Sequence, residues 1–344
     1  MIHTKKQLFP LFFLSLLILL TCNSIAWAKG SLEKHLIMGT TMGTTYAVTV
    51  VSESGIDTDL LKKQIDARLV MVNQSMSMFS PTSELSRFNS TKAHVPFKIS
   101  RDFAYVMDQS KRLYNLTNGA WDGTLKPLVD LWGFGTKEKI TKAPAPKAIN
   151  DLLKTIGFNK IEILENALQK KTPFVTLDLG SIAKGFGVDA VALLLEKSGF
   201  KSFLVEIGGE VFTRGTKPGN LPWTVGISRP EKGSAPDTLY RSIELKDMAL
   251  ATSGDYRNFV IINNKAYSHI IDPTTGYPVE TGVVSASVTA ENCTFADGLA
   301  TALMVMPPEK AVALVNNLKK VECLIVVKKK DGTFMDLTSK GFPL

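Results

Sequence analysis

Apolar residues recur along this chain at two spacings, one typical of helices and the other of strands. They fall on one side of a helix over residues 57–73 and again over 101–117, and the second segment stops at Asn118-Gly119, a pair that commonly ends helices. The loop Thr40–Thr44 leads into an alternating run that reaches Val50 and predicts a strand. The first third of the chain is therefore expected to mix helix and strand.

The middle of the chain carries a glycine-containing connection. The β-branched, apolar run Phe174–Leu177 predicts a strand that ends at Asp178, and after Gly180 a helix is expected to begin at Ile182. The free backbone N–H groups of such a helix start can cradle a phosphate, and Lys184 would add a cation in the first turn. The same pattern also fits an ordinary strand–turn–helix connection with a surface lysine.

Short strand-like runs separated by turns dominate the second half. They predict strands at 203–207, 223–227, 241–245, 249–252 and 258–262, and the alternating run Val283–Thr289 predicts a half-buried strand. Helices are expected near 295–304 and 308–318, followed by a hairpin around Asp331-Gly332. The predicted fold class is α/β (α+β), with mixed, largely antiparallel sheets and flanking helices.

The amino terminus has the pattern of a secretory signal. Lys5 and Lys6 precede an apolar run from Leu8 to Leu20, and Ala26-Trp27-Ala28 provides small residues at a cleavage site. We predict a signal peptide over residues 1–28, a single domain over 29–344, and export to the bacterial periplasm. The alternative is lipoprotein processing at Cys22, which would anchor the protein to the inner membrane. Soluble export is favoured because Thr21 is bulkier than the residue usual before such a cysteine.

The net charge bears on the possible partners of the protein, and the cysteines bear on whether it contains a disulfide. The formal net charge of +8 over 344 residues becomes +6 when Lys5 and Lys6 leave with the signal. This basic excess is scattered and matches no nucleic-acid-binding motif, so no nucleic-acid partner is expected. Cys293 and Cys323 remain after removal of the signal. They could form a disulfide in an oxidising compartment, or Cys323 could simply belong to the core.

A possible metal site lies on the predicted helix near residue 300. Asp297 and Thr301 are four residues apart and hence on one helical face. A carboxylate with a hydroxyl is an oxygen-only set of the kind that Mg²⁺ accepts while it keeps water and substrate phosphates as further ligands. The alternative is a helix-capping aspartate and a threonine bonded back to its own turn.

His269 is the best candidate for a general base. It lies between a strand-like segment and the tight turn Asp272-Pro273, whereas His35 and His94, the other histidines after the signal, have no such setting. A purely structural role is the alternative. A neighbouring acid, Asp255 or Asp272, could serve as the base instead.

Six short segments between about Met38 and Phe334 carry a further signal through their order: Met42-Gly43-Thr44, Asp178–Gly185, Gly208-Gly209, Thr252–Arg257, Ser268–Gly276 and Ala296–Ala302. In these segments and their order the chain resembles the ApbE family of FAD:protein FMN transferases. The order of six motifs makes the resemblance much more specific than any one of them.

The resemblance implies an activity and its site. An enzyme of this kind would bind FAD with Mg²⁺, cleave the pyrophosphate, join FMN to a threonine or serine hydroxyl and release AMP. The acceptor would be an exported or membrane redox protein, such as a subunit of a membrane NADH:quinone or ferredoxin-linked redox pump. The implied FAD-site residues are Met42, Phe79, Ala120, Trp121, Asp122, Asp178, Lys184, His269 and Ile271. The implied metal ligands are Asp297, Thr301 and, through backbone carbonyls, Ser181 and Ala300.

Two other functions are compatible with parts of this pattern. A Mg²⁺-dependent FAD pyrophosphatase would use the same site with water as the nucleophile. A flavin-binding carrier would need a pocket but no metal ligands, so the pair Asp297 and Thr301 argues against it.

Overall fold

The computed structural model describes residues 32–53, 55–135, 140–231, 233–235, 238–256, 258–263 and 265–343. The predicted signal peptide, Cys22 and Arg257 lie outside the described residues.

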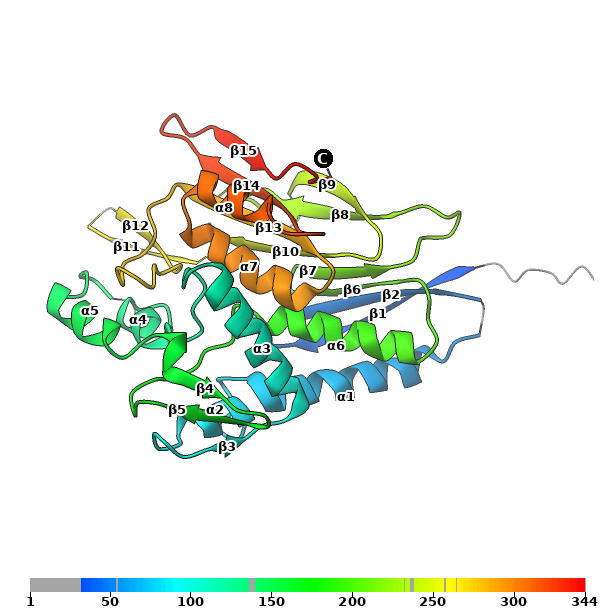
Figure 1. The fold of residues 1–344 in the computed structure, drawn as a ribbon. Helices are drawn as coiled ribbons and strands as arrows, with labels where there is room; N and C mark the ends of the chain where they lie inside the picture. Colours follow the sequence, from blue (N-terminus) through cyan, green and yellow to red (C-terminus); the bar gives the residue numbers. More distant parts are fainter. Residues whose placement is uncertain are drawn as a thin grey trace, which may run out of the picture.

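The central element is an antiparallel sheet that collects strands from both ends of the chain (Figure 1). Among the described residues its strand order is β1-β2-β6-β7-β10-β13-β14-β15, and each neighbouring pair is antiparallel. These strands are β1 (Glu33–Thr41), β2 (Thr44–Ser52), β6 (Phe203–Ile207), β7 (Glu210–Arg214), β10 (Ala249–Gly254), β13 (Val283–Ala290), β14 (Glu322–Lys328) and β15 (Phe334–Thr338).

Helices cover one face of this sheet (Figure 1). Two of them, α6 and α7, pack on the strands and against each other, and α1 and α3 pack around them, while α8 packs on β14 and β15. Their apolar faces and that side of the sheet form the main hydrophobic core. These helices are α1 (Thr58–Met76), α3 (Arg101–Leu116), α6 (Ala183–Lys197), α7 (Cys293–Val305) and α8 (Pro308–Val315).

The opposite face of the sheet is covered by a separate hairpin. Strands β8 (Trp223–Ser228) and β9 (Leu239–Leu245) pair with each other and enclose a second apolar cluster against β7, β10 and β14. Two-sided coverage explains why the central strands of the sheet are almost entirely buried.

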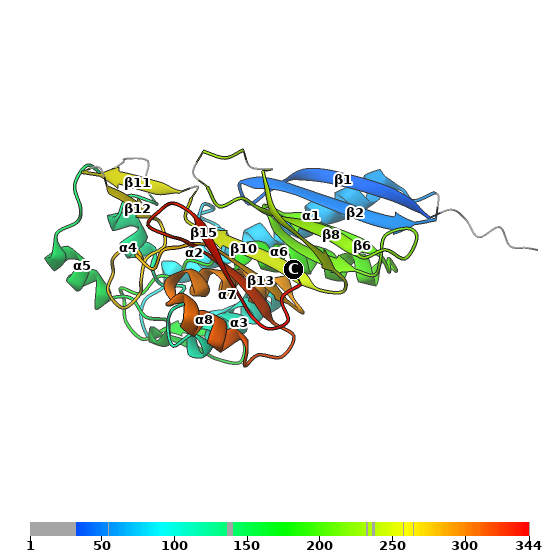
Figure 2. The same ribbon diagram turned by 90° about the horizontal axis from the view of Figure 1, so that it is seen from above.

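Smaller elements complete the fold at the edge of the helical layer. The helices α4 and α5 lie near the hairpin β11–β12, at the end opposite to the start of β1 (Figure 2). The strands β3, β5 and β4 form a small sheet of their own. The bounds are α2 (Glu84–Asn89), α4 (Lys126–Leu131), α5 (Pro146–Leu153), a 3₁₀ turn (Phe158–Lys160), β3 (Phe97–Lys98), β4 (Ile161–Ile163), β5 (Ala167–Lys170), β11 (Phe259–Ile262) and β12 (Lys265–Ser268).

The predicted fold class and most predicted elements are confirmed. The structure has the expected helices as α1, α3, α6, α7 and α8, and the expected strands of the second half as β6, β8, β9, β10 and β11, with the last hairpin as β14–β15. Helix α3 ends where Asn118 and Gly119 both take positive φ, as the sequence pair predicts.

Residues 174–177 do not form the predicted strand. Val175 and Leu177 are buried, but Phe174 lies in a turn and is 69% exposed, and the segment joins no sheet. Instead, the Asn89 side-chain amide replaces a strand partner: Oδ1 accepts from the Leu177 N–H at 2.8 Å and Nδ2 donates to the Leu177 carbonyl at 2.8 Å. The N–H and the carbonyl of Leu177 are thus bonded without a neighbouring strand, and the apolar pattern alone predicted the wrong element.

Two further expectations are corrected. Strand β13 is not half-buried. Its polar residues Ser285, Ser287 and Thr289 are each only 1% exposed, so both faces of the strand are covered. The segment Thr40–Thr44 is not a simple loop, since β1 extends to Thr41 and pairs with β2 through a two-residue turn. Met42 and Gly43 both have positive φ, as that tight hairpin requires.

Within the described part of the chain, no helix has the length and apolar character needed to cross a membrane. Cys293 and Cys323 are both buried and free, so the disulfide alternative is not supported.

Candidate functional site

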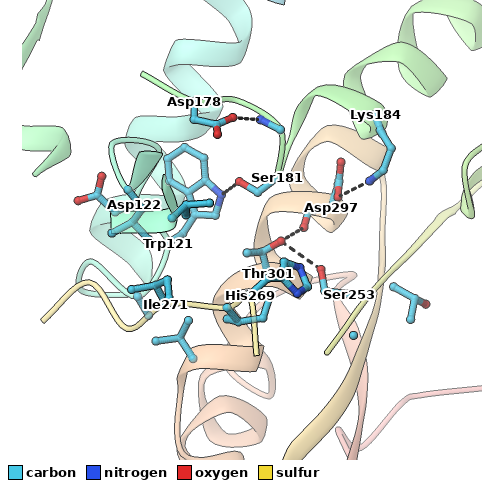
Figure 3. Close-up of a pocket in the computed structure, with 18 of the residues that line it drawn as sticks. Trp121, Asp122, Asp178, Ser181, Lys184, Ser253, His269, Ile271, Asp297 and Thr301 are labelled. Carbon is cyan, nitrogen blue, oxygen red and sulfur yellow. Dashed lines mark hydrogen bonds and ion pairs between the residues drawn. The ribbon is translucent and has the colours of Figure 1, made fainter. Parts of the chain in front are cut away.

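A cavity of about 420 Å³ brings together residues from distant parts of the chain. Its walls come from the segments that precede α4 and α6, from the turn between β6 and β7, from the end of β10, from the segment after β12 and from α7. The sequence-predicted residues that line it are Ala120, Trp121, Asp122, Asp178, Ser181, Lys184, His269, Ile271, Asp297 and Thr301 (Figure 3).

Asp297 is held by the close approach of α6 and α7. Its carboxylate Oδ2 accepts the Gly185 N–H at 2.9 Å, and the residue is only 3% exposed. A Cβ at Gly185 would lie 2.3 Å from the Cys293 carbonyl oxygen, so glycine is what allows the two helices to meet here. The capping interpretation of Asp297 is wrong, because Asn292 caps α7 by accepting from the Phe295 N–H.

Thr301 lies one turn further along α7, on the same face as Asp297. Its hydroxyl is 3.1 Å from the Ser253 hydroxyl and 3.4 Å from the Asp297 carbonyl oxygen (Figure 3). The predicted bond back to the helix is therefore present, but it is long, and the hydroxyl also faces the cavity.

Lys184 is not a free surface lysine. Its ammonium Nζ lies 3.1 Å from Glu210 Oε1 and 3.8 Å from Asp297 Oδ1. Burial alone would lower the pKa of Lys184, but the two carboxylates outweigh burial and raise it, so the lysine stays charged. Burial raises the pKa of Glu210, and the nearby Asp297 charge adds to that increase.

The opposite wall is ordered by backbone and indole hydrogen bonds. Trp121 Nε1 donates to Ser181 Oγ at 3.1 Å, and Asp178 Oδ1 accepts the Gly180 N–H at 2.8 Å (Figure 3). Asp122 accepts from Thr124, through both its N–H and its hydroxyl, and from the Phe158 N–H. Burial raises the pKa of both Asp122 and Asp178, only partly offset by these hydrogen bonds.

His269 has a defined tautomer. Its Nδ1 lies 3.0 Å from the Asn258 carbonyl oxygen, which can only accept, so Nδ1 carries the proton and Nε2 keeps a lone pair in the neutral ring. Burial lowers the pKa of His269, and the Asn258 carbonyl opposes that effect only in part. The ring is therefore neutral at neutral pH and able to accept a proton.

Three predicted residues do not line the cavity. Phe79 is 99% exposed in the loop between α1 and α2, and Met42 packs on α6 near Gly187 from the β1–β2 turn. The Ala300 side chain is fully buried in the core, which leaves the proposed role of its backbone carbonyl untested.

The cavity also contains residues that the sequence analysis did not single out. One is Glu210, which follows the Gly208-Gly209 turn. Another is Lys126, the first residue of α4, which forms an ion pair with Asp130. The turn glycines were the available signal for Glu210, but nothing local indicated that its side chain would face Lys184. Four acids and two lysines among the lining residues give a formal charge of −2: Asp122, Asp178, Glu210 and Asp297 against Lys126 and Lys184.

Comparison with known proteins agrees with these features. The model of the ApbE family matches residues 42–325. A Vibrio cholerae protein named FAD:protein FMN transferase is 40% identical over 329 residues, which cover 95% of this chain and 96% of that protein. A Haemophilus influenzae protein of the same name is 39% identical, with 89% and 90% covered.

A solved structure shows the same fold. The structure of the flavin transferase ApbE from Vibrio cholerae superimposes with a TM-score of 0.81 at 40% identity, and the match covers 90% of this chain and 98% of that one. The family match, the sequence identity and the shared fold extend over nearly the whole described chain. This protein belongs to the ApbE family.

Proposed function

We propose that this protein transfers FMN from FAD to a threonine or serine hydroxyl of an acceptor protein and releases AMP. The observation that carries the proposal is that one cavity is lined by an aspartate–threonine pair, a lysine at a helix start and a histidine whose Nε2 can accept a proton. Relatives that are named for this activity match the chain over most of its length.

The residues present fit a magnesium ion in the chemistry of their donors. Asp297 and Thr301 offer only oxygen, as Mg²⁺ prefers, and the Lys184 ammonium stays 3.8 Å from Asp297 Oδ1, too far for a hydrogen bond. Within the described residues no three His, Cys, Asp or Glu side chains gather as a metal site. We propose Asp297 and Thr301 as ligands on this chemistry and the carbonyls of Ser181 and Ala300 on the family resemblance, with substrate oxygens completing the set.

The charge of the cavity gives a physical reason for a cation. A pyrophosphate entering a cavity with a formal charge of −2 would be repelled, although raised pKa values reduce that charge. Mg²⁺ would neutralise this repulsion and act as a Lewis acid toward the phosphate oxygens.

The residues of the chain then have distinct tasks in the proposed reaction. The acceptor hydroxyl oxygen attacks the phosphorus of the FMN portion, its proton moves to His269 Nε2, and the bond to the AMP phosphate breaks so that AMP leaves. Lys184 and the backbone N–H groups at the start of α6 would stabilise charge on the phosphates. Trp121 would hold the wall beside Ser181 through its indole hydrogen bond.

The acceptor and the location of the protein are also proposals. We propose that the acceptor is a subunit of a membrane NADH:quinone or ferredoxin-linked redox pump. The support is the family resemblance together with the signal-peptide pattern of residues 1–28, which favours export to the periplasm.

Transfer can be tested with the chain from residue 29 onward, FAD, Mg²⁺ and a candidate redox subunit that has an acceptor threonine. After denaturing electrophoresis the gel is read for flavin fluorescence, and AMP release is measured in parallel. The expected result is a fluorescent subunit band that disappears with EDTA and in a subunit whose acceptor threonine is replaced by valine. AMP release without any labelled band, with several candidate subunits, would indicate FAD hydrolysis. Bound FAD with neither product would indicate a carrier.

A further inference from the structure

Glu210 is a buried acid in the cavity wall that the proposed reaction does not use. It is 3% exposed at the first position of β7, and its Oε2 is buried without a hydrogen-bond partner in the described structure. A buried carboxylate with an unpaired oxygen is costly to keep. Its one ionic contact within the described residues is with Lys184.

Lys184 lies between two carboxylates and is much closer to one of them. The ion pair from Nζ to Glu210 Oε1, at 3.1 Å, is within hydrogen-bond distance, whereas the 3.8 Å ion pair with Asp297 Oδ1 is too long for a hydrogen bond. If Glu210 were absent, Asp297 would be the nearest acid, and the flexible lysine side chain could close the remaining distance. A direct pair would then occupy the Asp297 oxygen that a cation needs.

The turn before Glu210 holds this arrangement. Gly208 and Gly209 both have positive φ, and the Glu206 carboxylate accepts the Gly209 N–H at 2.6 Å. A Cβ at Gly208 would lie 3.4 Å from Lys184 Cδ, so the turn packs on the stem of the lysine. The position of the ammonium is therefore determined by the β6–β7 turn as well as by α6.

We propose that Glu210 is a positioning residue, which holds the Lys184 ammonium away from Asp297 and so leaves Asp297 Oδ1 available to a divalent cation. This inference rests on the proposed function, because it assigns Asp297 to cation binding. Glu210 acts through Lys184 and touches neither the cation nor the reacting phosphate.

The test compares Glu210→Ala, Glu210→Gln, Lys184→Met and the double variant Glu210→Ala/Lys184→Met. Mn²⁺ uptake is measured by the loss of the free-ion electron paramagnetic resonance signal, with FAD present and no acceptor. The Mg²⁺ concentration for half-maximal transfer is measured separately. Glu206→Ala is the matched control, because it loosens the same turn without removing the partner of Lys184.

We expect Glu210→Ala to weaken Mn²⁺ binding by about 10- to 100-fold, as is typical when a residue that orients the groups around a metal is removed. Glu210→Gln should weaken it clearly less, since the amide oxygen can still accept from the ammonium. In the Lys184→Met background the Glu210→Ala change should have no further effect, whereas a simple loss of negative charge would weaken binding there too. Glu206→Ala should weaken Mn²⁺ binding much less than Glu210→Ala does, because the turn is loosened but the partner of Lys184 remains.

Several results would overturn the inference. Unchanged Mn²⁺ affinity in Glu210→Ala, equal losses in the alanine and glutamine variants, or a full effect in the Lys184→Met background would each refute positioning through Lys184. If the unmodified protein transfers FMN but takes up no Mn²⁺, the metal assignment fails and the inference with it. If the unmodified protein transfers no FMN, the proposed function fails, and Mn²⁺ uptake still tests Glu210 separately.

Discussion

The contact between α6 and α7 at Gly185 allows a sharp test of how the fold positions Asp297. In Gly185→Ala the new Cβ would lie 2.3 Å from the Cys293 carbonyl oxygen, 2.7 Å from its carbonyl carbon and 2.8 Å from Asp297 Cβ. Two of these atoms belong to the backbone at the start of α7, so they cannot turn aside as a side-chain end can. The helices would have to separate, and the bond from the Gly185 N–H to Asp297 Oδ2 would lengthen.

The expected change in the free energy of unfolding of Gly185→Ala is the sum of two opposing contributions. Overpacking a well-packed contact costs about 1–3 kcal/mol. Alanine gains about 1 kcal/mol over glycine inside a helix, and Gly185 lies within α6. The net free energy of unfolding should therefore fall by up to about 2 kcal/mol, with a Tm decrease of about 2–4 °C for each kcal/mol. A shift of Asp297 by about 1 Å would also reduce kcat by about 100-fold.

Gly187→Ala is the matched control on the same helix. The added Cβ would lie 2.7 Å from the terminal methyl of Met42 and 3.2 Å from Ile207 Cδ1. Both atoms are ends of side chains, and the Met42 side chain is flexible. Urea unfolding and Mg²⁺-dependent transfer are measured for both variants. Gly185→Ala should be less stable and much less active than Gly187→Ala. Equal stability and activity in the two variants would refute the claim that close helix packing positions Asp297.

Three further predictions concern single side chains of the cavity. Asp297→Asn should lose Mg²⁺-dependent transfer yet stay folded, because its amide oxygen can still accept the Gly185 N–H; retained Mg²⁺ dependence would contradict the ligand assignment. The plot of kcat/KM against pH should fall on the acid side with a midpoint below 6.5, because burial lowers the pKa of His269 and protonation below that pKa removes the base. His269→Asn should lose this limb and about 10²–10⁴-fold in rate, and normal rates with normal FAD binding would exclude His269 as the base. Trp121→Phe should cost about 0.5–1.5 kcal/mol in urea unfolding by removing the hydrogen bond to Ser181, and unchanged stability would show that the bond contributes nothing net.

Local pattern was sufficient for much of the secondary structure. The helical period over 101–117 and the Asn118-Gly119 pair after it are properties of neighbouring residues, and α3 follows them closely. The spacing of Asp297 and Thr301 likewise placed both on one face of α7. The strand expected at Phe174–Leu177 is absent, and the backbone of Leu177 bonds instead to the side chain of Asn89. Asn89 lies 88 residues away, so no local sequence pattern could indicate this contact.

Some features of the candidate site could likewise be predicted from the sequence, whereas others depend on the tertiary structure. The amino-acid sequence by itself determined the family, the fold class and the set of reactive residue types, since ordered motifs and periodicity are written along the chain. Only the tertiary structure decided that Lys184 bonds to Glu210, that Gly185 supports Asp297 across 112 residues, and that Phe79 lies outside the cavity wall. The physical reason is that charge pairing and burial depend on distances in space, which packing of α6, α7 and the β6–β7 turn creates and sequence spacing does not specify.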